Sequence, residues 1–339
     1  MSRGAKFGLA AFALVLGGLG AGFLWLTDVP GESFRGPPQQ LTSIEFQRAE
    51  VMAQDIAAIA SVPHNLARPA ALEASAQHIE GRLRGMGLTP VLQQLDGQAS
   101  LARNIEVVIE PTNPDAETLV LGAHYDSAYS APGANDNGSG VAALLALADE
   151  LAPLSRKSAV RLRLVFFVNE EPPYFKTSRM GSLAYAEALS RKPERVRGML
   201  SLETMGYFDD RAGSQDYPFP LSLRYPDTGN FIAFVALTSS RDFLRQSVGD
   251  FRKHARVPSI GGSAPAMVQG IDWSDHWSFE QYGIPALMVT DTAPFRYPYY
   301  HTEQDTPDKV DVRRLSLVVS GLTAMLKDYC RESKPPLAD

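Results

Sequence analysis

Histidine and acidic side chains follow several apolar runs of the sequence at the point where each run ends. After the apolar run 118–121 and the two small residues Gly122 and Ala123 come His124 and Asp126. An aspartate two residues after a histidine can hold the second ring nitrogen and so orient the imidazole for metal binding. A hydrogen-bonded loop histidine also explains such a pair. His124 and Asp126 are therefore candidates for a metal site or for a structural loop.

A second candidate is Asp136, which lies in the glycine-rich loop 133–140 just before the apolar helix that starts at Val141. An acidic residue at such a position commonly forms a turn or caps the helix. The two oxygens of a carboxylate beside a helix start can alternatively bridge two cations. The loop alone is consistent with both interpretations.

Two adjacent carboxylates, Glu170 and Glu171, end the strongly apolar run 160–168. This pattern favours metal-assisted hydrolysis, because one carboxylate can bind a metal ion while its neighbour moves a proton. An acidic turn is the alternative. Glu203 ends the apolar run 196–202 in the same way and is a further candidate ligand.

His301, which lies beside a loop rich in proline and aromatic residues, is the other histidine in a ligand context. His276 could line the site, but its position beside Trp277 favours burial. The remaining three are interpreted as structural or solvated: His64, His78 and His254. Because Cys330 is the only cysteine, neither an intrachain disulfide nor a thiolate zinc cluster can form. Any metal must therefore bind to His, Asp and Glu.

Helical and strand patterns alternate from about Leu41 onward, which is typical of an α/β domain. Their periodicity predicts helices over 43–59, 70–86, 138–151, 182–189, 239–254 and 313–330. Valine-, isoleucine- and leucine-rich runs predict buried strands over 105–109, 119–123, 160–168, 196–202 and 284–289. We expect a mixed, mostly parallel central sheet flanked by helices. Ligand sites in such sheets lie at the carboxyl ends of the strands, where the candidate residues are.

Length and charge indicate one catalytic domain over residues 41–335, after a proline- and glycine-rich linker over 28–40. The formal net charge of the 339-residue chain is −6, and no long basic run occurs. A nucleic-acid partner is therefore not expected. Nothing in the sequence indicates an oligomeric state.

The first 27 residues form a separate hydrophobic segment. No charge occurs from Phe7 to Thr27, and ~21 helical residues span ~31 Å, close to the ~30 Å hydrocarbon core of a membrane. Arg3 and Lys6 precede the segment and Asp28 follows it, which predicts a membrane anchor with the catalytic domain outside the cytoplasm, in a periplasmic, extracellular or lumenal space. A cleaved signal peptide is the alternative, and it would make the protein secreted.

Taken in order, these motifs resemble the M28 family of zinc peptidases. The resemblance covers about residues 70–310 and depends on HxD at 124–126, NDN at 135–137, NEE at 169–171, the acidic residue 203 and HTxxDT at 301–306. It implies an aminopeptidase-like fold and an enzyme that hydrolyses N-terminal peptide bonds of peptide substrates. The segment 274–286 is also similar to that family.

Residue by residue, the resemblance implies two zinc ions that share one ligand. One ion would be bound by His124, Asp136 and Glu203, and the other by Asp136, Glu171 and His301. Three further residues would act on the substrate or the ligands: Glu170 as general base, Tyr300 on the oxyanion and Asp126 as support for His124. Many family members have aspartate where this chain has Glu203, and the extra methylene changes the geometry around one metal.

Two other functions fit the same residues. A glutaminyl cyclase keeps much of this ligand framework with a single zinc, whereas the complete NEE and NDN motifs resemble the peptidases. A non-enzymatic, membrane-tethered ectodomain of this fold usually lacks ligands, and here every candidate position is filled. For the substrate side-chain pocket, the sequence suggests residues that follow Glu171 and Glu203: Tyr174, Phe175, Met180, Tyr207 and Phe208.

Overall fold

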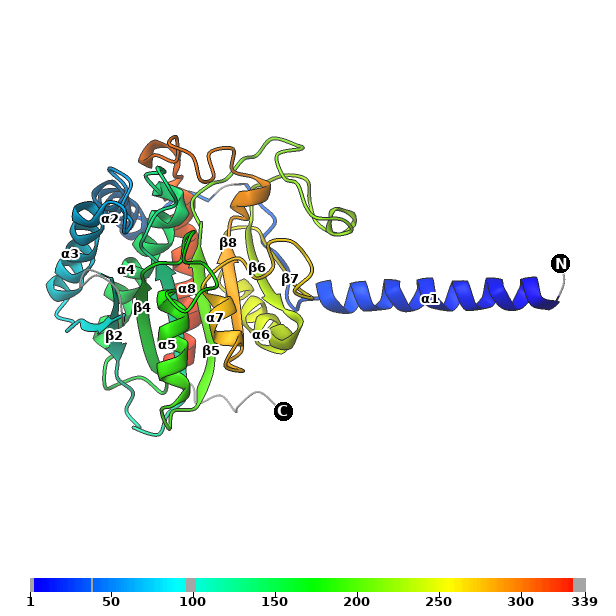
Figure 1. Ribbon diagram of the computed structural model, residues 1–339, viewed down its shortest axis with the longest axis horizontal. Coiled ribbons are helices and arrows are strands. Elements are labelled where there is room, and N and C mark those ends of the chain that lie inside the picture. Colours follow the sequence, from blue (N-terminus) through cyan, green and yellow to red (C-terminus); the bar gives the residue numbers. More distant parts are fainter. Residues whose placement is uncertain (1–2, 38, 96–101, 332–339) are drawn as a thin grey trace.

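A single eight-stranded mixed sheet forms the centre of the molecule (Figure 1). The computed structural model describes residues 3–37, 39–95 and 102–331, without the side chains of residues 3–6 and 8–11. The outermost residues of the predicted segments, 1–2 and 332–335, lie outside the described residues. The strands run in the order β1-β2-β4-β3-β5-β8-β6-β7. Their bounds are Val91–Gln94 (β1), Arg103–Ile109 (β2), Thr118–His124 (β3), Arg161–Phe167 (β4), Val196–Glu203 (β5), Ile232–Leu237 (β6), Ser259–Ala264 (β7) and Ala286–Thr290 (β8).

The middle of the sheet is parallel. β3 pairs in parallel with both β4 and β5, and β5 pairs in parallel with β8. At one side β2 and β1 add antiparallel strands, and at the other β6 runs antiparallel to β8 and carries β7 in parallel. The predicted mixed, mostly parallel sheet is therefore confirmed, and its parallel strands end at a common edge.

Helices cover both faces of the sheet. One face carries α2 (Ser43–Ile59), α3 (Pro69–Gly85), α4 (Gly140–Leu151), α6 (Arg241–Arg252) and α8 (Val312–Arg331), and the other carries α5 (Gly181–Ser190) and α7 (His276–Glu280). Alternate residues of the strands enter two separate cores, because successive side chains of a strand point to opposite faces. Leu119 and Leu121 of β3 pack beneath α4, whereas Val120 packs beneath α5.

The N-terminal helix α1 (Arg3–Thr27) projects from the rest of the molecule next to β7 (Figure 1). The sequence predicted a transmembrane helix here. Among the residues whose side chains the structure describes, no helix is long and apolar enough to cross a membrane. The predicted membrane span is therefore not found.

The predicted linker is partly docked onto the domain. Arg241 of α6 donates hydrogen bonds to the carbonyl oxygen of Trp25 at 2.9 and 2.7 Å. Arg252 of the same helix donates to the carbonyl oxygens of Pro30 and Gly31 at 3.1 and 2.8 Å. The backbone N–H of Ser259 in β7 donates to Ser33 Oγ at 2.8 Å. Residues 25–33 therefore lie along the outer edge of the sheet.

Candidate metal centre

The shared edge of the parallel strands brings the predicted site residues together. His124 is the last residue of β3 and Glu203 the last of β5, while Glu170 and Glu171 follow the end of β4. Asp136 lies at a kink in the segment Ala134–Ser139, which leads into α4, and its own backbone is not helical. His301 lies in the segment that follows β8. All of these side chains except His301 are at least nine-tenths buried.

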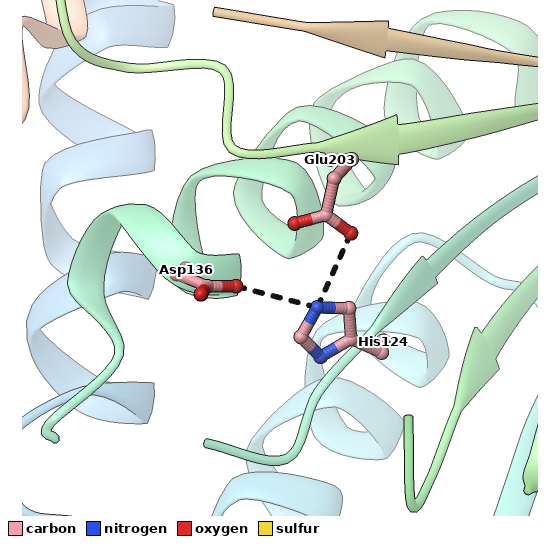
Figure 2. Close-up of side chains that lie close together, drawn as sticks. All are labelled: His124, Asp136 and Glu203. Atoms are coloured by element: carbon pink, nitrogen blue, oxygen red, sulfur yellow. Dashed lines mark ion pairs between the residues drawn. The ribbon is translucent and has the colours of Figure 1, made fainter. Parts of the chain in front are cut away.

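One group consists of His124, Asp136 and Glu203. His124 Nε2 lies 3.4 Å from Asp136 Oδ1 and 3.3 Å from Glu203 Oε2. Figure 2 shows both carboxylates directed at this one ring nitrogen. The three potential ligand atoms lie within 4.8 Å of one another, as the donors around a single metal ion must.

A second group shares Asp136 with the first. His301 Nε2 lies 3.0 Å from Asp136 Oδ2 and 3.3 Å from Glu171 Oε2. Each oxygen of Asp136 therefore faces a different histidine, which is the geometry that a carboxylate bridging two ions requires. A third possible group combines His124 with Glu170 and Glu171.

The chemistry of these side chains fits a bound cation. Among the described residues, His124 Nε2, Asp136 Oδ2 and Glu171 Oε1 are buried and make no hydrogen bond. Burial and the charge of Asp136 together raise the pKa of Glu171 to about 8, against the opposing effect of His301. Burial also raises the pKa of Glu203. Since a nearby cation favours ionised carboxylates, one or two metal ions would offset this cost. Nitrogen and oxygen ligands of this kind suit zinc.

Asp126 contacts the site differently from the sequence expectation. Its carboxylate oxygens accept hydrogen bonds from the backbone N–H groups of Glu170 and Glu171, at 3.0 and 3.1 Å. His124 Nδ1 is 3.1 Å from the carbonyl oxygen of Asp126 but 3.7 Å from its carboxylate. The backbone of Asp126 therefore orients the imidazole, while its side chain positions the two glutamates.

The loop that carries Asp136 is held by a residue that the sequence analysis did not select. Asp305 accepts hydrogen bonds from the backbone N–H groups of Asn135 and Asp136, at 2.8 and 3.1 Å, and from the Tyr297 hydroxyl at 2.7 Å. Asp305 is fully buried. Its place in the HTxxDT motif was the available signal for a role near the site.

Asn137 fastens the same loop to the end of β5. Its side-chain amide donates to the carbonyl oxygen of Leu202 at 2.8 Å, and its oxygen accepts from the N–H of Thr204 at 3.0 Å. Glu203 lies between these two contacts in the sequence. The position of Asp136 relative to Glu203 is therefore fixed by backbone contacts on both sides.

Glu170 and Tyr300 lie beside the ligands. Glu170 Oε2 is 3.8 Å from His124 Nε2, and burial raises the pKa of Glu170 well above its ordinary value. The Tyr300 ring stacks on the His301 ring with centroids 3.9 Å apart. Burial also raises the pKa of Tyr300, so its hydroxyl remains a hydrogen-bond donor at neutral pH.

The other histidines lie outside the centre. His276 is fully buried, and its Nε2 is 2.8 Å from the carbonyl oxygen of Ile271, while burial lowers its pKa to about 4. Buried His64 contacts the carbonyl oxygen of Val62, whereas His78 pairs with the buried carboxylate of Asp55 and His254 with the half-buried carboxylate of Asp328. These positions agree with the structural or solvated roles expected for them.

An apolar cavity opens from the metal centre at Glu203 and Tyr300. None of the five residues that the sequence suggested for the side-chain pocket lines it. The cavity instead adjoins β8, β6 and β7 and the loop around Leu221. Periodicity did not predict β6 and β7, and these strands place the cavity beside Glu203 rather than beside Glu171.

Comparison with known proteins agrees with this geometry. The profile of Peptidase family M28 matches residues 104–325. The Escherichia coli K12 protein YfbL, which is described as uncharacterized, is 37% identical over 264 residues, covering 75% of this chain and 80% of that protein. Aminopeptidase YwaD of Bacillus subtilis is 27% identical over 240 residues, covering 69% of this chain but only 46% of YwaD. Leucine aminopeptidase 1 of Trichophyton equinum is also 27% identical, and the match covers 55% of that protein. The chain therefore spans about half the length of these aminopeptidases.

Solved structures share the fold at low sequence identity. The Legionella pneumophila LapA aminopeptidase aligns with a TM-score of 0.64 at 16% identity, covering 88% of this chain and 78% of LapA. A Bacteroides thetaiotaomicron glutaminyl cyclase aligns with a TM-score of 0.59 at 17% identity, covering 91% of this chain and all of that chain. Both enzyme types therefore occur on this fold, and the site residues must decide between them.

Proposed function

Since the chain belongs to peptidase family M28, we propose that it is a zinc-dependent aminopeptidase that hydrolyses N-terminal peptide bonds with two metal ions. The observation that carries the proposal is the pair of ligand groups that share Asp136. One group contains His124 and Glu203, and the other contains Glu171 and His301. When bound, two ions at these groups would lower the pKa of a shared water and polarise the scissile carbonyl.

Glu170 is the residue best placed to move the proton. Its backbone is held by Asp126, and its carboxylate lies next to the ligand His124. It would accept a proton from the attacking water and return that proton to the leaving amine. Burial raises its pKa, and nearby cations would offset this effect and keep the carboxylate ionised, as a base must be to accept a proton.

Tyr300 is positioned to stabilise the oxyanion. It lines the cavity together with Glu203, next to the place where a substrate carbonyl would lie. A buried neutral hydroxyl that donates to developing negative charge lowers the barrier to acyl transfer. Stacking on His301 restricts the orientation of the Tyr300 ring.

The charge of the cavity supports an amino-terminal rather than a carboxy-terminal substrate. Glu203 is the only charged residue among those that line it. A free α-ammonium group could therefore bind beside Glu203, whereas a terminal carboxylate would find no cation there.

The location of the domain outside the cytoplasm remains a prediction from the charges that flank residues 7–27.

Metal analysis paired with an aminoacyl-anilide assay on the full chain tests the proposal. We expect two zinc ions per chain and anilide hydrolysis that chelation abolishes and zinc restores. One zinc per chain with cyclisation of N-terminal glutamine would instead identify a glutaminyl cyclase. Stable metal binding without turnover of any peptide would identify a non-enzymatic ectodomain.

A further inference from the structure

We propose that the cavity beside the metal centre binds an acyl chain longer than any amino-acid side chain, so that the protein also hydrolyses long-chain N-acyl amides. The inference depends on the hydrolytic function proposed above, because the same metal centre would cleave the amide. It concerns what lies on the carbonyl side of the scissile bond.

The cavity extends sideways from the metal centre across the sheet. It begins at Glu203 and Tyr300 and continues over Met288 of β8 and Val235 of β6 to Ile260 of β7. Figure 1 shows β8, β6 and β7 in this order, on the side of the sheet from which α1 projects. Counted together with the solvent space at its open mouth, the cavity measures about 860 Å³.

Its length exceeds that of a single residue. β7 is three strands away from β5, which carries Glu203, and neighbouring strands are about 4.8 Å apart, so the far end lies about 14 Å from β5. The tip of an arginine side chain, the longest of the amino acids, is six bonds of about 1.5 Å from its Cα and reaches no more than about 9 Å. An unbranched chain needs at least about nine such bonds to fill the whole length.

The lining is mostly apolar along this length. Its far part is formed by Leu221, Val235, Ile260 and Ala264, together with the ring of Tyr225. The Tyr225 hydroxyl is occupied, since it donates to the carbonyl oxygen of Gly261 at 2.8 Å. No lining residue beyond Glu203 carries a charge. Burial of methylene groups is favourable in such surroundings, whereas burial of a charged or hydrogen-bonding group is not.

The floor of the far part of the cavity is the face of β6 and β7 opposite α6. α6 covers one face of β6 and β7, where Gly261 packs against Val248. On the cavity face Val235, Ile260 and Gly262 are only half-buried. A Cβ at Gly262 would lie 2.3 Å from the Tyr225 hydroxyl, so glycine is needed for this tyrosine to cross above the strand.

Exposed apolar side chains belong to the loops that form the walls. Phe219 is 82% exposed and Leu223 75% exposed, and both flank the lining residue Leu221. Met267, next to the lining residue Val268, is 90% exposed. An acyl chain that enters between these loops would therefore meet apolar surface before it reaches the interior.

The reaction requires only water as a second reactant. The amide C–N bond breaks, a C–O bond forms between the acyl carbon and the water oxygen, and Glu170 carries one water proton to the leaving nitrogen. The products are a carboxylic acid and an amine. No oxidant, reductant or second substrate besides water is needed.

A series of acyl p-nitroanilides tests the inference with the full zinc-loaded chain. Butyryl, hexanoyl and decanoyl p-nitroanilides share one leaving group with leucyl p-nitroanilide, so only the carbonyl side varies. We expect kcat/KM to rise about threefold for each added methylene, and at least about a hundredfold from butyryl to decanoyl. A flat or falling series would overturn the inference, and cleavage of leucyl p-nitroanilide in the same assay would leave the proposed function intact. If no substrate of either kind is cleaved, both are wrong.

Substitutions in the cavity floor on β6 and β7 test whether the acyl chain of the substrate binds there. Val235→Phe should lower the decanoyl-to-butyryl ratio at least tenfold, and Ile260→Trp gives an independent obstruction on β7 if the first variant is unstable. Val91→Phe is the matched control, because Val91 is an exposed valine of β1 at the opposite side of the sheet. It should leave the ratio unchanged. An unchanged ratio in both folded floor variants would contradict the inference.

Discussion

Ser274 Oγ donates a hydrogen bond of 2.8 Å to Glu203 Oε2, the same oxygen that lies 3.3 Å from His124 Nε2. Ser201 Oγ lies 2.8 Å from Ser274 Oγ and extends the contact into the sheet. Ser274 is fully buried and belongs to the segment before α7. The longer side chain of Glu203 is therefore held in place by a residue from a distant part of the sequence.

Replacement of Ser274 by alanine should weaken metal binding. Loss of a hydrogen bond to a ligand typically lowers metal affinity roughly tenfold to hundredfold. Zinc titration in a competing chelator measures the change. Ser278→Ala is a suitable control, since Ser278 is also fully buried but contacts Ser182 and Met180 rather than a ligand. Equal zinc affinities of the two variants would show that the Ser274 contact does not support Glu203.

Glu170→Gln should retain zinc and lose turnover. The amide keeps the shape of the side chain but cannot accept the proton, and the loss of a general base costs roughly 10²- to 10⁴-fold in kcat. Zinc content and kcat on an aminoacyl anilide are measured in parallel. Glu303→Gln, an exposed change close to His301, should have no effect. Near-normal kcat in Glu170→Gln would exclude this residue as the base.

Asp126→Asn should destabilise the turn that presents the two glutamates. Its carboxylate accepts from two buried N–H groups, and the amide NH₂ would leave one of them without an acceptor at a cost of about 1–3 kcal/mol. Denaturant unfolding gives the change in stability, and kcat should fall with it. Asp115→Asn in an exposed loop is the control. Unchanged stability of Asp126→Asn would show that the turn is held by other contacts.

Chelation of the metal should lower the melting temperature. The buried carboxylates repel one another without a cation, and zinc present at 100 times its Kd stabilises the folded state by about 2.7 kcal/mol relative to the metal-free protein. Thermal melts with chelator and with added zinc measure the difference. Asp136→Asn should respond much less to zinc, because it weakens both ligand groups. A melting temperature that is independent of zinc would contradict the proposed metal centre.

The free energy of unfolding should decrease as the pH falls from about 4.5 to about 2, because Glu45 of α2 becomes protonated. Burial alone would raise the pKa of Glu45, but hydrogen bonds from Arg256, Thr42 and Ser320 lower it to about 2. A group with a lowered folded-state pKa stabilises the protein above its unfolded pKa and loses that effect as the pH falls towards the folded pKa. Glu45→Gln should reduce this part of the acid dependence, whereas exposed Glu50→Gln on the same helix should not. Identical pH profiles of all three proteins would contradict the role of Glu45.

Local periodicity predicted the long elements well. The helix expected over 43–59 is Ser43–Ile59, and the strand expected over 119–123 is Thr118–His124. The short strands β6 and β7 were not predicted. β7 has the sequence SIGGSA, whose glycines weaken any strand pattern, and its place in the sheet depends on tertiary pairing with β6.

The candidate ligands were predicted as a set from their local patterns. His124, Glu171 and Glu203 follow apolar runs, Asp136 lies in a glycine-rich loop, and His301 begins the HTxxDT motif. Their supporting contacts could not be predicted in the same way. Asp305 and Ser274 act on residues far away in the sequence, and nothing in their local patterns shows which ligand they contact. The sequence also could not show which oxygen of Asp126 contacts His124. In the folded protein the carbonyl oxygen of Asp126 contacts the imidazole, while its carboxylate accepts from the N–H of Glu170.

The ligands of the candidate centre come from β3, the loop before α4, the ends of β4 and β5, and the segment after β8. The only cysteine, Cys330, is free, so the chain contains no covalent cross-link. A metal ion held at this edge would close several long loops of the polypeptide at one point, and such closure removes conformational entropy from the unfolded chain much as a disulfide does. The metal centre would thus act as a reversible cross-link between the strands of the sheet.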